Sequence, residues 1–139
     1  MAVSVLAIVQ ARMGSNRLSG KVLKTIQGKP ILFHIVNRLN KVDEIDKVVI
    51  ATSDLPADDM VYQMAGKYGI SCFRGSESDV LQRFHDAAVM DTAEHLIRIT
   101  GDCPLVDPPT LSKLIKFYFK GVMTFAVLPV VRVLPMKTI

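Results

Sequence analysis

Residues 3–23 read VSVLAIVQARMGSNRLSGKVL, and an aliphatic run there gives way abruptly to a polar, basic segment. The run from Val3 to Val9 is rich in β-branched and aliphatic residues without polar alternation, which is typical of a strand buried on both faces of a parallel sheet. The segment that follows carries two glycines and the cations Arg12, Arg17 and Lys21. The stretch therefore predicts a buried strand whose carboxyl end opens into an anion-binding loop.

The same order of strand and helix repeats along the chain. Further apolar, β-branched runs predict strands at 46–53, 70–73 and 95–100. Helical spacing of apolar residues predicts helices within 25–42, 54–69, 76–90 and 107–120. This alternation predicts an α/β fold in three layers, with a mainly parallel sheet, helices on both faces and ligands bound at the carboxyl ends of the strands.

The helix expected within 76–90 has a predicted buried face. Its apolar residues Val80, Leu81, Phe84, Ala87 and Ala88 recur at helical spacing, behind a start rich in serine and aspartate that can cap the helix. We therefore expect these five side chains to pack on the sheet.

Composition fits a single compact domain. The chain has 139 residues, 50% of them hydrophobic, so it can bury a substantial core. We expect an α/β domain over residues 1–120. The remaining residues, 121–139, form an atypical tail that is nearly all apolar and lacks clear helix caps or a period.

Several classes of protein are disfavoured by charge and patterning. The net charge is a mild +4, aromatic residues make up 6% and tryptophan is absent, so we expect no nucleic-acid partner. No apolar run approaches the roughly 20 residues of a transmembrane helix, and residues 2–9 lack the features of a signal peptide. Cys72 and Cys103 lack the spacing of zinc ligands or a redox motif. We therefore expect a cytoplasmic protein with reduced thiols and no membrane partner.

Two familiar phosphate-binding motifs do not fit the basic segment. A Walker A loop has four residues between its glycines, whereas five separate Gly14 from Gly20, and Val22 replaces the hydroxyl that holds magnesium. A dinucleotide fingerprint fails because residues 13–15 supply one glycine only. What remains is a loop whose backbone N–H groups can approach an anion and whose cations neutralise it, which favours a triphosphate. The alternative is a solvated surface loop that is basic by chance.

A carboxylate follows the strand expected at 95–100. In RITGDCPLVDP, Asp102 stands after Gly101 at the edge of the sheet where the basic loop also lies. A carboxylate repels a triphosphate unless a cation lies between them, and Mg²⁺ is the ion that takes carboxylate together with phosphate oxygens. Asp102 is thus a candidate magnesium ligand. The alternative is that it caps a turn, as Gly-Asp pairs commonly do.

Five blocks resemble a known enzyme family. IVQARMGSNRLSGKVL, KPILFHIVNRL, VVIATS, FRGSESDVLQRF and RITGDCPLVDP follow one another in register over residues 3–118. Together they resemble the cytidylyltransferases of sialic acid and of 3-deoxy-manno-octulosonate, and most closely the branch of spore coat polysaccharide biosynthesis protein F. The resemblance implies a nucleotide-diphospho-sugar transferase (Rossmann-like) fold and a domain that binds CTP. It also implies transfer of CMP to an acidic or other cell-surface sugar, with release of pyrophosphate, in polysaccharide or glycan biosynthesis.

The resemblance also implies site residues. It assigns nucleotide binding to Ala11, Arg12, Gly14, Ser15, Arg17 and Lys21, and it places the segment of Arg74 and Asp79 beside the nucleotide pocket. Arg98 is a further nucleotide-binding candidate, because a charge in a central strand must be paired or line a cavity. Catalytic roles fall to Arg12, Lys21 and Asp102, and the metal ligand is Asp102, with Mg²⁺ as the cofactor. Ser19 departs from the family pattern, which usually has proline there, so the loop loses rigidity.

Three of these positions have structural alternatives. Arg74 precedes a predicted helix and borders the pocket by resemblance, and Asp79 shares this segment. Asp79 could instead pair with Arg83 one helical turn away. Arg98 lies among apolar residues of a central strand, so it must either line the site or form an ion pair.

The tail raises the question of completeness. The resemblance ends near Phe119, and such enzymes continue well beyond that point, so we expect this short chain to lack elements that full activity requires. In the DNA, Met123 and Thr124 encode aspartate when read two positions into each codon, which predicts that 121–139 are an out-of-frame remnant. Sequencing past codon 139 tests this. Two other functions stay open, a nucleotide-sugar-dependent glycosyltransferase and a non-catalytic nucleotide-binding remnant. A homodimer is also possible.

Overall fold

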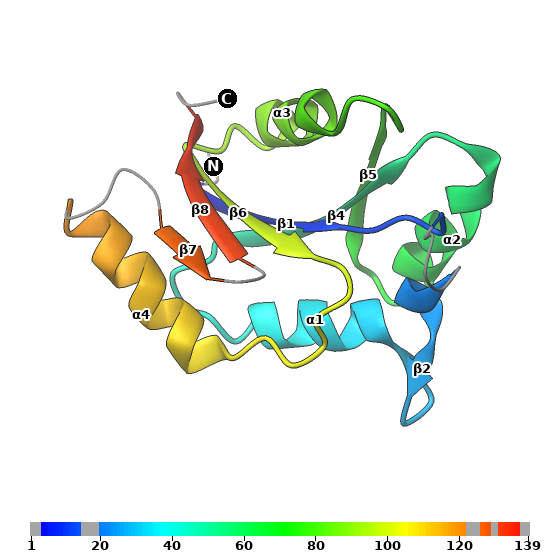
Figure 1. Cartoon of the computed structure of the whole chain (residues 1–139), viewed down its shortest axis with the longest axis horizontal. Coiled ribbons are helices and arrows are strands. Elements are labelled where there is room, and N and C mark those ends of the chain that lie inside the picture. The colour runs from blue at the N-terminus through cyan, green and yellow to red at the C-terminus, as the bar shows by residue number, and fades with distance from the viewer. Residues whose placement is uncertain (1–3, 15–19, 122–125, 129–130, 137–139) are drawn as a thin grey trace.

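A computed structural model describes residues 4–14, 20–121, 126–128 and 131–136. Within this part of the chain, a six-stranded sheet has the order β5-β4-β1-β6-β8-β7 (Figure 1). Its parallel strands are β1 (Val5–Gln10), β4 (Lys47–Ser53), β5 (Ser71–Gly75) and β6 (His95–Thr100). Two antiparallel strands complete it, β8 (Val131–Pro135) beside β6 and β7 (Ala126–Leu128) beside β8. A separate small hairpin joins β2 (Thr25–Ile26) and β3 (Lys29–Pro30).

Helices cover both faces of the sheet. The helices α1 (Ile31–Leu39), α2 (Asp59–Lys67) and α4 (Pro108–Phe119) supply residues to one core cluster, and α3 (Val80–Met90) supplies the other. Two 3₁₀ turns, η1 (Lys21–Leu23) and η2 (Pro56–Asp58), lie in the connections. Figure 1 shows α3 on one side of the sheet and α1 and α4 on the other. The predicted three-layer α/β fold with a mainly parallel sheet is confirmed.

The central strand β1 divides the core by simple alternation. Val5, Ala7 and Val9 join the cluster on the α1 side, whereas Leu6 and Ile8 join the cluster under α3. All five side chains are at most 4% exposed. A continuous apolar run is therefore required here, because neither face of the strand meets water.

The strand ends that carry the polar residues lie at one edge. Gln10, the last residue of β1, is aligned with Ala51 of β4 and with Thr100 of β6. Gly101 follows directly, and a Cβ built there would lie 2.4 Å from the carbonyl oxygen of Gln10. Only glycine allows this close approach, which brings the segment after β6 against the segment after β1.

One predicted helix face is shifted. Leu81 is 62% exposed, so its assignment to the buried face of α3 is wrong. Arg83 is fully buried instead, together with Phe84, Ala87 and Ala88. The positions 83, 84, 87 and 88 form a helical stripe in which arginine occupies an inward position that apolar periodicity alone does not reveal.

The tail contains secondary structure that the sequence analysis left unassigned. The strand β8 pairs with β6 in a register that places Arg132 opposite Arg98, and β7 pairs with β8. Val133 is fully buried in the main core. Among the described residues, none of the helices has both the length and the apolar character needed to cross a bilayer.

Candidate functional site

The segment after β1 begins in the core, where a backbone hydrogen bond joins its first residue to β4. Ala11 is 2% exposed, and its N–H donates to the carbonyl oxygen of Ala51 at 3.1 Å. Two residues on, the carbonyl of Met13 accepts the N–H of Gly20 at 2.9 Å. Gly20 has a positive φ of 70°, which favours glycine at this turn. The hydrogen bond between Met13 and Gly20 brings these two residues together, and Gly14 directly follows Met13.

Two predicted site residues fall outside the description of this segment. Ser15 and Arg17 lie in 15–19, outside the described residues. Their assignment to nucleotide binding stays a prediction.

Lys21 and Asp102 meet across this edge of the sheet. The Lys21 Nζ donates to Asp102 Oδ2 at 3.1 Å, and the two side chains are 31% and 48% exposed. Partial burial acts to raise the pKa of the Asp102 carboxyl, but hydrogen bonds to it, that of Lys21 above all, together with the Lys21 charge outweigh burial, so the pKa is lowered. The arrangement provides an ionised carboxylate and an ammonium group side by side.

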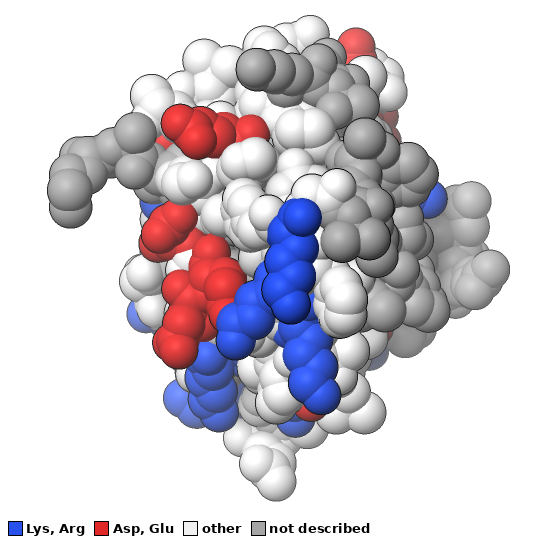
Figure 2. All heavy atoms as spheres, turned by 90° about the vertical axis from the view of Figure 1, so that its left-hand side faces the viewer, with Lys and Arg blue, Asp and Glu red and all other residues white. Residues whose placement is uncertain are grey.

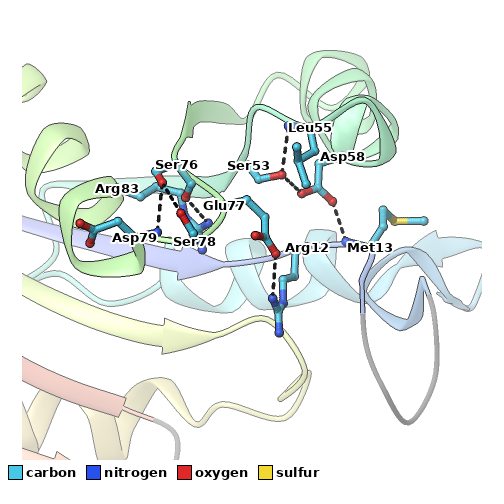
Figure 3. Close-up of polar contacts among 10 residues, drawn as sticks. All are labelled: Arg12, Met13, Ser53, Leu55, Asp58, Ser76, Glu77, Ser78, Asp79 and Arg83. Atoms are coloured by element: carbon cyan, nitrogen blue, oxygen red, sulfur yellow. Dashed lines mark hydrogen bonds and ion pairs between the residues drawn. The ribbon is translucent and has the colours of Figure 1, made fainter.

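Arg12 extends from the same segment toward the loop between β5 and α3. Its Nη1 lies 3.3 Å from Oε1 of Glu77, and the side chains are 51% and 39% exposed (Figure 3). The guanidinium is therefore accessible to a solvent-borne anion that competes with Glu77.

Asp58 is a site residue that sequence reasoning missed. Its side chain is only 3% exposed, and Oδ1 accepts the backbone N–H of Met13 at 2.7 Å. The hydroxyl of Ser53 donates to Oδ2 and accepts the N–H of Leu55 at 3.2 Å (Figure 3). A buried carboxylate thus joins the end of β4 to the segment that follows β1.

Arg74 is engaged in the connection between β4 and α2. Its Nε donates to the carbonyl of Ser53 at 2.9 Å and its Nη2 to the carbonyl of Leu55 at 2.8 Å. Nη1 forms an ion pair with Asp59 at 2.7 Å. These bonds give Arg74 a structural role in the described state. Its role toward a nucleotide stays a prediction.

Asp79 caps α3. Its Oδ1 accepts the N–H of Gln82 at 2.9 Å, as the sequence predicts for the start of this helix. Both Asp79 and Arg83 are described, and they form no ion pair with each other. The Nη1 of Arg83 donates instead to the carbonyl of Ser76 at 2.9 Å.

Arg98 is half-buried, and its guanidinium contacts a neutral side chain and an aromatic ring. Its Nη2 donates to Oε1 of Gln10 at 2.9 Å, and the guanidinium carbon lies 5.3 Å from the ring centre of Phe84. Burial and the charge of Arg132 on the neighbouring strand lower its pKa. Within the described residues, no carboxylate lies within ion-pair distance of this guanidinium.

The opposite side of the molecule differs in character. Figure 2 shows the side where β1 begins, and acidic and basic side chains there lie next to one another. Lys47 pairs with Asp91 at 2.5 Å and Lys116 with Glu44 at 3.5 Å. These two lysines are therefore engaged with carboxylates.

Comparison with known sequences decides the family. The sequence model of the cytidylyltransferases matches residues 6–134. The chain belongs to the cytidylyltransferase family. The match extends through most of β8, beyond Phe119, where the sequence analysis expects the resemblance to end.

Two individual relatives match most of this chain. The spore coat polysaccharide biosynthesis protein SpsF of Bacillus subtilis (strain 168) is 41% identical over 119 residues, which are 83% of this chain and 50% of the relative. A solved cytidylyltransferase of Leptospira borgpetersenii serovar Hardjo-bovis (strain JB197) is 30% identical with a TM-score of 0.83, covering 99% of this chain and 62% of that one.

A third comparison concerns the fold alone. A solved CMP:2-keto-3-deoxy-manno-octonic acid synthetase complexed with CTP has a TM-score of 0.76 at 24% identity, covering 88% of this chain and 50% of that one. It shares the nucleotide-diphospho-sugar transferase fold. The chain spans about half the length of the curated relatives it matches.

Asp102 is the carboxylate beside Lys21 at the candidate site. Among the described residues, no three histidine, cysteine, aspartate or glutamate side chains come together as a ligand set. Asp102 is ionised and half exposed, so it suits one coordination position of a hard cation whose other ligands are phosphate oxygens and water.

Proposed function

We propose that this chain is the nucleotide-binding part of an enzyme that transfers CMP from CTP to a sugar with release of pyrophosphate, in polysaccharide or glycan biosynthesis. The observation that carries the proposal is the Lys21–Asp102 pair. It places an ammonium group and an ionised carboxylate beside an arginine-bearing loop, at the edge where an α/β sheet binds ligands. In a cytidylyltransferase, this combination suits a triphosphate with its divalent cation.

The proposed reaction is an in-line displacement at the α-phosphorus. A sugar hydroxyl oxygen forms a bond to that phosphorus and loses its proton, while the bond to the oxygen bridging the α- and β-phosphorus breaks and pyrophosphate leaves. No covalent intermediate with the protein is required. Catalysis then depends on positioning and on stabilising the charge that accumulates on the phosphate oxygens.

Two cations of the chain exchange partners in this proposal. In the described state Arg12 contacts Glu77 and Lys21 contacts Asp102. When the triphosphate arrives, Arg12 and Lys21 turn to its oxygens, and Arg17 and Ser15 add further donors from the same loop. Lys21 leaving Asp102 frees that carboxylate to hold Mg²⁺. The metal, when bound, neutralises phosphate charge.

The remaining expectations belong to the same proposal. CTP and a sugar are the partners, the protein acts in the cytoplasm without nucleic acid or membrane, and a homodimer is possible. Ala11, Gly14, Arg74, Asp79 and Arg98 are the other residues that we propose to border the nucleotide.

Calorimetric titration of CTP, UTP, ATP, GTP and a nucleoside diphosphate sugar such as UDP-glucose, with and without Mg²⁺, tests the proposal. We expect magnesium-dependent binding that favours CTP, and we expect Lys21→Ala to weaken the affinity for CTP by at least about tenfold. Lys24→Ala is the matched control, because Lys24 is exposed just beyond η1. Absence of CTP binding by the folded chain, or a preference for a nucleoside diphosphate sugar, would overturn the proposal, the latter in favour of a glycosyltransferase.

A further inference from the structure

The buried carboxylate of Asp58 has no role in the proposed reaction, yet it is costly to maintain. It is 3% exposed and belongs to the short turn η2, which follows β4. Burying a carboxylate is unfavourable unless hydrogen bonds and charge compensate it. The bonds that compensate it therefore show what this residue does.

One of these bonds reaches the segment that carries Arg12. Oδ1 of Asp58 accepts the N–H of Met13 at 2.7 Å, across 45 residues of sequence. A hydrogen bond from a backbone N–H to a carboxylate is about twice as strong as one between neutral groups. The next peptide bond along from Arg12 is thus anchored to a buried, charged group.

Met13 also connects to the residue before Lys21, through a second hydrogen bond. The carbonyl of Met13 accepts the N–H of Gly20 at 2.9 Å, and Lys21 follows Gly20. A Cβ on Gly20 would lie 3.0 Å from the terminal methyl carbon of Met13, so side chain and turn are also in close contact. Asp58, Met13 and Gly20 therefore form one series of contacts that ends beside both cations of the proposed triphosphate site.

The far side of Asp58 is fixed as well. Ser53, fully buried at the end of β4, donates its hydroxyl to Oδ2. Arg83 of α3 is fully buried, and the Asp58 charge acts to raise its pKa while burial lowers it. The end of a core strand thus holds the carboxylate through the Ser53 hydroxyl, and Arg83 acts on it through its charge alone.

We propose that Asp58 is a positioning residue for the triphosphate, which fixes the Met13 backbone so that Arg12 and Lys21 converge on one anion. The proposal rests on the proposed function for its substrate, but the hydrogen bond between Asp58 and the Met13 backbone can be tested without any activity. A residue that merely stabilised the fold would alter stability without selectively altering triphosphate affinity.

The chain offers a matched control at the other end of β1. Oδ2 of Asp46 accepts the N–H of Val5 at 2.9 Å, so a carboxylate also binds a backbone N–H of the segment there. This contact lies at the amino end of the strand, whereas Met13 follows the carboxyl end. Asp46→Asn therefore removes the same kind of charge-assisted bond away from the site.

The test compares Asp58→Asn, Ser53→Ala, Asp46→Asn and the unaltered chain. We expect Asp58→Asn to weaken magnesium–CTP binding about tenfold by calorimetry and to speed hydrogen exchange at the Met13 amide about tenfold without nucleotide. Where a sugar acceptor supports turnover, KM for CTP rises while KM for the acceptor changes less than about twofold. Asp46→Asn leaves CTP affinity, exchange at the Met13 amide and KM for CTP unchanged. Ser53→Ala has a smaller effect in the same direction as Asp58→Asn.

The outcomes separate the two proposals. Unaltered exchange at Met13 in Asp58→Asn, or an equal loss of CTP affinity in Asp46→Asn, overturns the positioning role. If the unaltered chain binds no triphosphate, the proposed function fails, and hydrogen exchange at Met13 still decides whether Asp58 fastens this segment. If Asp58→Asn does not fold, Ser53→Ala decides, and undisturbed exchange and CTP affinity in that variant count against the role.

Discussion

The ammonium of Lys21 lies 3.1 Å from the carboxylate of Asp102, although 81 positions separate them in the chain. The contact depends on Gly101, whose lack of a side chain lets the segment after β6 approach the carbonyl of Gln10. It joins the candidate phosphate loop to the candidate metal ligand. Both partners are partly exposed, so the pair contributes little to stability and can exchange for ligands at small cost.

Removing Lys21 changes the acidity of Asp102. In Lys21→Met the pKa of Asp102 rises, because burial then acts without the opposing ammonium. Because the pKa of Asp102 is lowered in the folded protein, its ionised carboxylate contributes a small amount to folding stability above pH 3.8, the unfolded pKa. This contribution is lost as the pH falls through the folded pKa. Carbon-13 NMR of the carboxyl across pH 2–6 measures the change. An unchanged titration midpoint would contradict the role of Lys21.

Asp102→Asn removes the charge that would hold the metal. We expect magnesium-dependent pyrophosphate release to fall at least about a hundredfold, because an amide oxygen is a poor ligand for Mg²⁺. The melting temperature changes little, since the side chain is half exposed. Asp107→Asn, at the exposed cap of α4, is the control and keeps full activity. Undiminished turnover in Asp102→Asn would exclude it as a metal ligand.

Glu77 competes with phosphate for Arg12. In Glu77→Gln we expect CTP to bind up to about fivefold more tightly, because an exposed ion pair of this kind is worth about 0.2–1 kcal/mol. Calorimetry at low ionic strength measures the gain, and added salt reduces it. Glu94→Gln, an exposed glutamate before β6, serves as the comparison. Weaker binding in Glu77→Gln would instead make Glu77 part of the binding surface.

Strands β1 and β4 were predictable because burial on both faces leaves a continuous apolar run. The runs at 46–53, 70–73 and 95–100 correspond closely to β4, β5 and β6. The tail strands were not predictable in this way. β7 and β8 are short and follow no clear period, and they form through pairing with β6, which sequence spacing does not express.

Asp58 and Arg83 were hidden for a different reason. An aspartate at the start of a helix normally indicates a favourable interaction with the helix dipole, so its bond to Met13 across the fold leaves no local signal. Arg83 is buried because Gly75 leaves space for it. A Cβ at Gly75 would lie 3.0 Å from Cγ of Arg83. Apolar periodicity therefore predicts Leu81 on the buried face, whereas the space beside Gly75 is occupied by Arg83.

Cys72 should resist thiol reagents. Burial raises the pKa of its thiol to about 11, Arg74 acts to lower it and Asp58 to raise it, so little thiolate is present near pH 8. We expect iodoacetamide to modify Cys72 at pH 8 at least about tenfold more slowly in the folded chain than in urea. Peptide mass spectrometry over time follows this residue separately from Cys103. Equal rates in the two states would contradict the raised pKa of this half-buried thiol.

Asp58 and Arg83 should be energetically coupled. Arg83→Met leaves Asp58 without its buried counter-charge and Ser76 without a donor, so we expect the free energy of unfolding to fall by about 1–3 kcal/mol. In an Asp58→Asn background the same substitution should cost less, by about 0.5–2 kcal/mol, because the charge it would strand is already gone. Urea denaturation of the four chains gives the coupling. Strictly additive losses would show that the two buried charges do not stabilise each other.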